Sequence, residues 1–135
     1  MGSGTSNLYG NLTGNITTNA NNQGTVTLVW DSSGKVQTVT GNIGTSTSLD
    51  LSTLNIGSAT VPTNYSSTTI SGDVFASSTV LNNNGITNSS TLILSNGSDI
   101  TSTITTADSN MGILTLLGSS TITGAVGTNT DKLAQ

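Results

Sequence analysis

Short bursts of apolar residues alternate with polar stretches along the whole chain. The bursts are Thr25–Trp30, Lys35–Thr40, Ser48–Leu51, Thr91–Leu94 and Ile113–Leu116. In them aliphatic and polar residues alternate at least in part, and this period of two predicts strands. Clusters of Asn, Gly, Ser and Asp at 19–24, 31–34 and 82–85 predict turns between the strands. No stretch of about 11 residues keeps an apolar stripe of helical period, so the chain is predicted to be all-β.

A five-residue pattern with an aliphatic residue at each end occurs five times. The copies are Leu12–Ile16, Val39–Ile43, Ile70–Val74, Ile100–Ile104 and Ile122–Val126, and their first residues lie 27, 31, 30 and 22 positions apart. Repeats of this length are typical of chains that stack one supersecondary unit on the next. In addition, Leu92–Ile100 aligns with Leu114–Ile122, position 92 on position 114, and each reads as strand, tight turn and strand. Such a unit has the form of one coil of a parallel β-helix.

The middle residue of every copy is small. These residues are Gly14, Gly41, Gly72, Ser102 and Gly124. A small residue could point inward between the two aliphatic side chains of its strand. Alternatively, it could mark a corner that requires a positive φ or a close backbone approach. The second residues of the copies would point outward and form one column, which consists of Thr13, Thr40, Ser71, Thr101 and Thr123.

Two other organisations fit parts of the pattern. An antiparallel sandwich would use Asn84-Gly85 and Asn96-Gly97 as hairpin turns. Disorder would suit the polarity, but disordered chains usually carry many charges and prolines, whereas this chain has eight charged residues and one proline. The repeat therefore favours an all-β parallel β-helix, or β-solenoid, of about five coils. Residues 1–4 look like an expression start and linker, and residues 5–135 are predicted to form one solenoid domain, which could be a fragment of a larger one.

The charge of the chain argues against several partners. Six aspartates outnumber Lys35 and Lys132, and the net charge is −4. Binding to nucleic acid needs clustered Lys or Arg, so we expect none. No apolar run approaches the roughly 20 residues of a membrane-spanning helix. No signal peptide is visible at the start of the chain.

Paired carboxylates are the main candidates for catalysis. Asp73 and Asp99, or Asp99 and Asp131, could lie on neighbouring coils, and glycan hydrolysis needs two carboxyl groups about 5–9.5 Å apart. Aspartates among Gly, Ser and Asn more often bond to the backbone of a turn, which fits Asp31 and Asp99. The chain has no His or Cys to activate a serine or to bind zinc. It also lacks the EF-hand loop and the Gly-Gly-x-Gly-x-Asp repeat of calcium-binding rolls. We therefore predict no enzyme activity, no catalytic residue, no cofactor and no metal, and the sequence identifies no binding residue.

The C-terminal part of the chain resembles a known family. Gly112–Asn129 reads as coils of the type LTLxGxxTITGxVGT among Thr- and Asn-rich turns, and Thr130–Gln135 reads as the start of a further coil. The segment resembles the passenger domains of autotransporters, above all the rickettsial surface cell antigens of the outer-membrane protein B-like family. The resemblance is closest over residues 90–135 and looser over 9–74. It implies a right-handed parallel β-helix on the outer side of a Gram-negative cell, in contact with host cells.

The sequence and the resemblance together predict a non-enzymatic cell-surface or secreted segment that acts as a rigid stalk or an adhesive module. Its partner would be a host-cell surface protein or a glycan. One alternative is a filament, because the open ends of a stack can template another copy. Another alternative is an ice-binding solenoid that uses the threonine column, although the uneven spacing of the copies argues against a lattice-matching face. Trp30 is either a core residue or an exposed partner anchor.

Overall fold

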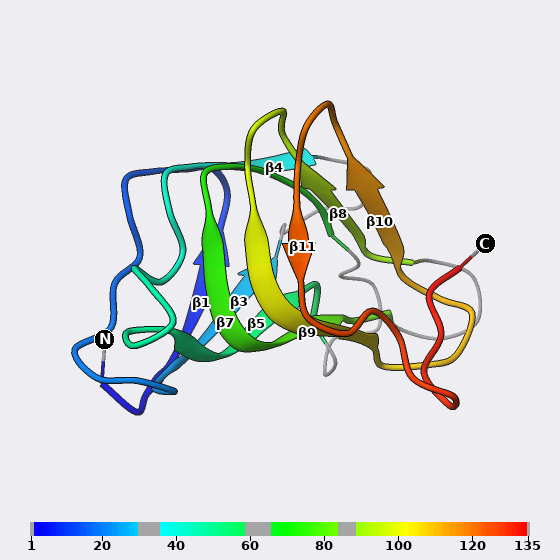
Figure 1. Cartoon of the computed structure of the whole chain (residues 1–135), viewed down its shortest axis with the longest axis horizontal. Coiled ribbons are helices and arrows are strands. Elements are labelled where there is room, and N and C mark those ends of the chain that lie inside the picture. Colours follow the sequence, from blue (N-terminus) through cyan, green and yellow to red (C-terminus); the bar gives the residue numbers. More distant parts are fainter. Residues whose placement is uncertain (1, 30–35, 59–65, 84–88, 135) are drawn as a thin grey trace.

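The computed structural model describes residues 2–29, 36–58, 66–83 and 89–134, and within them the chain is all-β without a helix (Figure 1). Within these ranges, eleven strands form two sheets. Sheet A consists of β1 (Thr5–Tyr9), β3 (Thr25–Val29), β5 (Leu51–Ile56), β7 (Val74–Leu81), β9 (Ile100–Thr106) and β11 (Ile122–Thr123). Sheet B consists of β2 (Leu12–Thr13), β4 (Val36–Thr40), β6 (Ser67–Ser71), β8 (Thr91–Leu94) and β10 (Ile113–Leu116).

Consecutive strands of the chain lie in different sheets, and each strand pairs in parallel with the strand one coil away. This arrangement is a β-solenoid, as predicted. The path from β2 to β10 makes four full turns through a five-stranded sheet, with partial turns beyond it, in agreement with about five coils. The parallel pairing contradicts the antiparallel sandwich. Asn96-Gly97 connects β8 to β9, which belong to different sheets, and Asn84-Gly85 lies outside the described residues.

Aliphatic side chains form columns that run through the interior from coil to coil, and two of these columns flank the corner that follows sheet B. Sheet B contributes Leu12, Val39, Ile70, Leu94 and Leu116. The corner that follows contributes Ile16, Ile43, Val74, Ile100 and Ile122. All of these except Leu12, Leu116 and Ile122 in the two end coils belong to the buried core.

The register corrects the predicted repeat. Copies one to three lie in phase, but Ile100 pairs with Val74, the last residue of copy three, instead of with Ile70. The partner of Ile70 is Leu94, so the second half of the stack has shorter coils than the copies suggest. From Leu12 to Leu116, successive partners in sheet B lie 27, 31, 24 and 22 positions apart. The predicted alignment of the last two coils is confirmed, because Leu92 pairs with Leu114 and Ile100 pairs with Ile122.

The reason for the change of phase is the length of the corner. In the first three coils the two core residues lie four positions apart, as in Leu12 and Ile16. In the last two coils they lie six positions apart, as in Leu94 and Ile100. The core position before the corner and the one after it both require an aliphatic residue. The recurring motif begins at the position before the corner in the first three coils, in sheet B. In the last two coils it begins at the position after the longer corner, and it therefore lies in sheet A.

The strand predictions are mostly confirmed. Strands β8 and β10 have the predicted bounds, and β3 and β4 match within the described residues. The prediction of a strand over Ser48–Leu51 is wrong, because β5 begins only at Leu51. The residues before it form a turn closed by the bond from the Thr45 N–H to the Leu49 carbonyl, at 3.2 Å. Trp30 lies outside the described residues.

The small middle residue has two different roles in the five copies. Gly14 and Gly41 lie at the corner, with φ of 127° and 129°. A Cβ atom on Gly41 would lie 2.5 Å from the carbonyl oxygen of Gly14 on the preceding coil. Ser102 instead points inward, is 4% exposed, and its hydroxyl lies 2.8 Å from the hydroxyl of Thr79. Both alternatives for this position are therefore realised, at different copies.

Gly14 and Gly41 allow the close approach of coils to be measured separately from backbone strain. Their φ values are nearly equal, but a Cβ atom on Gly14 would meet nothing within 4 Å. We expect Gly14→Ala to lower the free energy of unfolding by about 1–3 kcal/mol through strain alone. Gly41→Ala should cost about 1–3 kcal/mol more because of the added clash. Urea unfolding measures the difference, and equal losses in the two variants would contradict the role assigned to the close approach.

Candidate functional site

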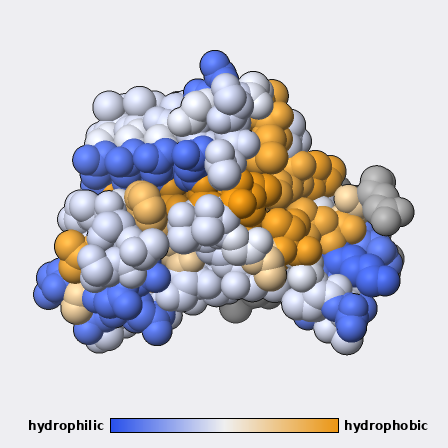
Figure 2. Space-filling model, viewed as in Figure 1, coloured by the Kyte–Doolittle hydropathy of each residue, from blue (hydrophilic) through white to orange (hydrophobic). Residues whose placement is uncertain are grey.

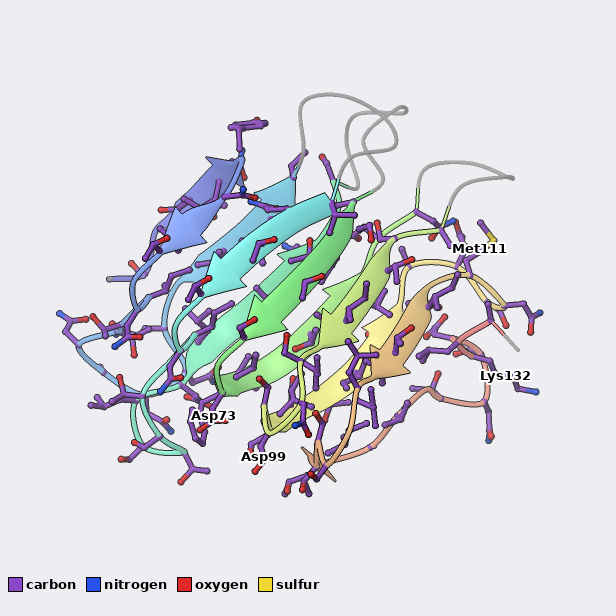
Figure 3. The ribbon with its side chains drawn as sticks, turned by 90° about the horizontal axis from the view of Figure 1, so that it is seen from above. Asp73, Asp99, Met111 and Lys132 are labelled. Atoms are coloured by element: carbon purple, nitrogen blue, oxygen red, sulfur yellow. The ribbon has the colours of Figure 1, made fainter. Side chains whose placement is uncertain are left out.

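The two aspartates considered for catalysis lie on neighbouring coils at one edge of the stack (Figure 3). They belong to a polar ladder formed by Asn15, Asn42, Asp73, Asp99 and Thr121. The Oδ1 atom of each of the first four accepts the backbone N–H of the next member, at 2.8 to 3.0 Å. We call this column the Asn/Asp ladder.

Each aspartate of the Asn/Asp ladder makes two hydrogen bonds to the preceding coil. The Asp73 N–H donates to the side chain of Asn42, and the Asp73 carbonyl accepts the N–H of Ile43 at 2.8 Å. Asp99 repeats the same pair of bonds to Asp73 and Val74. Asp73 and Asp99 therefore bond to backbone, as expected for aspartates in such surroundings, but the backbone belongs to the next coil instead of to their own turn.

The remaining candidates are not gathered with this pair. Asp131 lies in a C-terminal turn, where its Oδ2 accepts the hydroxyls of Thr128 and Thr130 at 3.2 and 3.1 Å. Asp31 lies outside the described residues. Within the described ranges, no group of three or more acidic side chains is placed to hold a metal ion, and no helix has the length and apolarity needed to cross a membrane.

The predicted outward column is split between the two sheets. Thr13, Thr40 and Ser71 stack in sheet B, as expected. Thr101 and Thr123 instead stack in sheet A above the half-buried Phe75 of β7. The prediction of one continuous column is therefore wrong, for the same reason as the predicted phase of the repeat. The second row, Phe75–Thr101–Thr123, places an aromatic ring among outward threonines.

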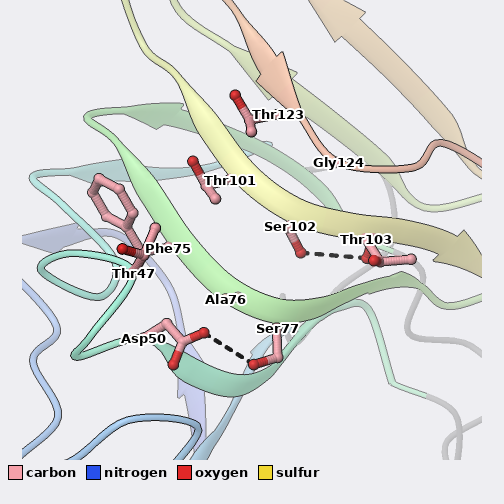
Figure 4. A pocket seen from close by; sticks show the side chains of 10 residues that line it. All are labelled: Thr47, Asp50, Phe75, Ala76, Ser77, Thr101, Ser102, Thr103, Thr123 and Gly124. Atoms are coloured by element: carbon pink, nitrogen blue, oxygen red, sulfur yellow. Dashed lines mark hydrogen bonds between the residues drawn. The ribbon is translucent and has the colours of Figure 1, made fainter.

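This row forms part of a surface groove of about 320 Å³ that crosses several coils (Figure 4). The groove is lined by Thr47, Asp50, Phe75, Ala76, Ser77, Thr101, Ser102, Thr103, Thr123 and Gly124. Hydroxyl groups predominate in this lining. Phe75 provides an aromatic ring and Asp50 provides a carboxylate. Pockets in proteins that bind small ligands commonly combine such an apolar surface with a few oriented polar groups.

Two local features of the chain create the groove. The turn after Ile43 projects from the stack, and Gly44 within it packs against the backbone of Phe75, where a Cβ atom would clash. This turn brings Thr47 and Asp50 to one wall of the groove. In addition, the pairing of β7 with β9 is irregular between Phe75 and Ser78, as in a β-bulge. Such a bulge re-aims side chains, and Ser77 beside it is exposed.

Asp50 is held in a fixed orientation within the groove. Its Oδ1 accepts the backbone N–H of Asn22 at 2.6 Å, and its Oδ2 accepts the hydroxyl of Ser77 at 2.9 Å. The Asp50 carbonyl also accepts the hydroxyl of Thr18 at 3.5 Å. Because a carboxylate offers about four acceptor positions, Asp50 retains acceptor capacity for a ligand.

The sequence predicted neither Asp50 nor Phe75 as a site residue. A signal existed for Phe75, because Val74 ends a copy of the repeat with its side chain inward, and the next residue must then point outward. The chain contains no other phenylalanine. Asp50 gave no such signal, since its place depends on a turn that was predicted to be a strand.

Comparison with known proteins identifies no relative of this chain. No protein-family model matches the chain, and the searches of curated proteins and of solved structures find no similar protein.

A pair of substitutions at Asp73 tests its structural role. We expect Asp73→Ala to lower the free energy of unfolding by about 1 kcal/mol, because the N–H of Asp99 loses its acceptor. Asp73→Asn retains Oδ1 and should stay within about 0.5 kcal/mol of the unchanged protein. Thermal or urea unfolding compares the two variants. Equal destabilisation by Asn and Ala would show that the bond to the next coil is not what Asp73 contributes.

Proposed function

We propose that this chain is a non-enzymatic, rigid segment of a cell-surface β-solenoid, which holds an adhesive surface at a fixed distance. One observation carries the proposal. The core columns run through every coil and are open at both ends of the stack, as in a segment on which further coils can be placed. The resemblance to autotransporter passengers supports a place outside the cell.

The C-terminal end leaves core positions uncovered. Leu116 and Val126, which lie at core positions, are 41 and 47% exposed. Ile113, which pairs with the outward Thr91, and Leu117 add further exposed aliphatic surface at this end. Apolar side chains gather over β10 and β11 in Figure 2. Leu116 and Val126 continue columns whose other members, such as Leu94 and Ile104, are fully buried. Leu116 and Val126 are exposed because the described residues place no coil above them.

The N-terminal end has matching features. Leu8 and Leu12 are only partly buried, and with Ile16 and Val26 they line an open hollow of about 260 Å³. In addition, β1 and β2 are the edge strands of their sheets, as β11 and β10 are at the other end. Edge strands present unpaired backbone groups that accept a further strand. Both ends therefore offer the same two features to a neighbouring coil, namely open strand edges and uncovered aliphatic columns.

Rigidity can be measured with two spin labels, because the chain has no cysteine of its own. Thr5 and Thr103 are exposed and belong to one column, which continues through Thr25, Thr53 and Ser78. Four inter-strand steps separate their Cα atoms by about 19 Å. We expect labels at Thr5→Cys and Thr103→Cys to give one narrow distance distribution in pulsed electron–electron double resonance. A broad distribution would contradict a rigid spacer.

A filament is the second candidate, and the same two ends favour it. Stacking the C-terminal end on the N-terminal end of another copy would bury both sets of aliphatic side chains, and such a head-to-tail contact does not close on itself. If this occurs, the mass measured by light scattering should rise with concentration. Leu116→Lys combined with Val126→Lys should abolish the rise, whereas Thr69→Lys on the lateral face should not. A constant monomer mass would exclude the filament and leave the spacer unaffected.

A further inference from the structure

We propose that the groove around Phe75 binds a neutral glycan chain, with one sugar ring stacked on the phenyl ring. This inference rests on the proposed adhesive role, to which it assigns a ligand class and a site. Three properties of the groove support it: an aromatic ring beside a row of hydroxyls, an oriented carboxylate, and the absence of a cationic side chain among its lining residues.

The first property is the position of Phe75. Its ring lies at one end of the row Phe75–Thr101–Thr123, whose members stand on adjacent strands (Figure 4). The inter-strand spacing places Thr101 and Thr123 about 5 and 10 Å along the surface from Phe75. A sugar has one face of C–H groups that can pack on an aromatic ring, and its hydroxyls project from the rim. A ring on Phe75 would therefore direct the next sugars of the chain toward the two threonines.

The second property is the fixed carboxylate. Asp50 lies across the groove on the projecting turn and is held by Asn22 and Ser77. Sugar hydroxyls are donors, and a hydrogen bond to an ionised acceptor is stronger than one between neutral groups. Since Asp50 is oriented before any ligand arrives, binding does not need to order it. The threonine hydroxyls can both donate and accept, which matches the mixed pattern of a sugar rim.

The third property is the charge of the groove. Its one charged lining residue is Asp50, and the whole chain has a net charge of −4. A sialylated or sulfated glycan would bring negative charge toward this carboxylate, which is unfavourable. An apolar ligand would bury the hydroxyls without partners. The chemistry that satisfies both conditions is an uncharged polyhydroxylated chain.

The experiment begins with a glycan array that carries neutral glucans, mannans and galactans beside sialylated and sulfated glycans. We expect binding to a neutral class. Titration calorimetry with a soluble tetrasaccharide of that class then compares variants. Phe75→Leu keeps an apolar side chain but removes the ring, and it should weaken binding at least tenfold. Asp50→Asn removes the charge and should weaken binding several-fold. Thr69→Ala, on the outer face of sheet B, is the matched control and should bind as the unchanged protein does.

A further variant tests the groove if Phe75→Leu does not fold. If Phe75→Leu unfolds, Thr101→Arg fills the groove from an outward position and should also reduce binding at least tenfold. Circular dichroism and thermal unfolding establish that each variant is folded. The inference is overturned if no neutral glycan binds, if only anionic glycans bind, or if the groove variants bind as tightly as Thr69→Ala. The spin-label distance reports on the spacer alone, so failure of the glycan site and failure of the rigid stalk can be told apart.

Discussion

The hydrogen-bond register between successive coils is the constraint on which the rest of this structure depends. Each strand pairs in parallel with a strand that lies a full coil away in sequence, so no coil is stabilised by its own local contacts alone. The register aligns every inward aliphatic residue above its equivalent, and this alignment produces one continuous core from a chain in which only 32% of residues are hydrophobic. A slip of one residue would turn those side chains outward, which explains why the corners carry so many specific contacts.

The Asn/Asp ladder and the corner glycines act on the same register in complementary ways. A ladder side chain fixes which residue of the next coil lies above it, because its Oδ1 accepts one particular backbone N–H. The glycine permits the approach that this bond requires, since a Cβ atom at Gly41 would meet the Gly14 carbonyl. Gln37 adds a third device inside the core. It is fully buried in β4, and its Nε2 donates to the carbonyls of Leu8 and Gly10 at 3.2 and 2.6 Å. Polar side chains thus set the register, while the aliphatic columns stabilise the stack.

The sequence predicted the architecture well and the site poorly, for identifiable physical reasons. Strands β8 and β10 and the alignment of Leu92 with Leu114 followed from strong apolar periodicity, which is a local property. The phase of copies four and five did not follow, because an aliphatic residue satisfies the position of Ile70 and that of Val74 equally well. The role of Gln37 could not be predicted either. The polar Gln37 points inward while the apolar Val36 beside it is 52% exposed, which is the reverse of what their hydropathy predicts. Its donors have partners only once the first coil is in place. Asp50 likewise acquires its position from Asn22 and Ser77, which belong to other coils.

Uneven sequence spacing does not make the outer surface irregular. Coils of unequal length keep their strands in register, and the turn at 44–50 shows how additional residues can lie outside the strands. The strand faces can therefore remain regular while each turn varies in length and chemistry. The groove arises where these two parts meet: the row Phe75–Thr101–Thr123 belongs to the regular sheet, and Thr47 and Asp50 belong to the turn at 44–50, which lies on the turn at 17–24 of the first coil. A solenoid can in this way gain a specific site at a single coil without any change to the core columns, because the turn is bonded to the stack mainly through its ends and through Asp50.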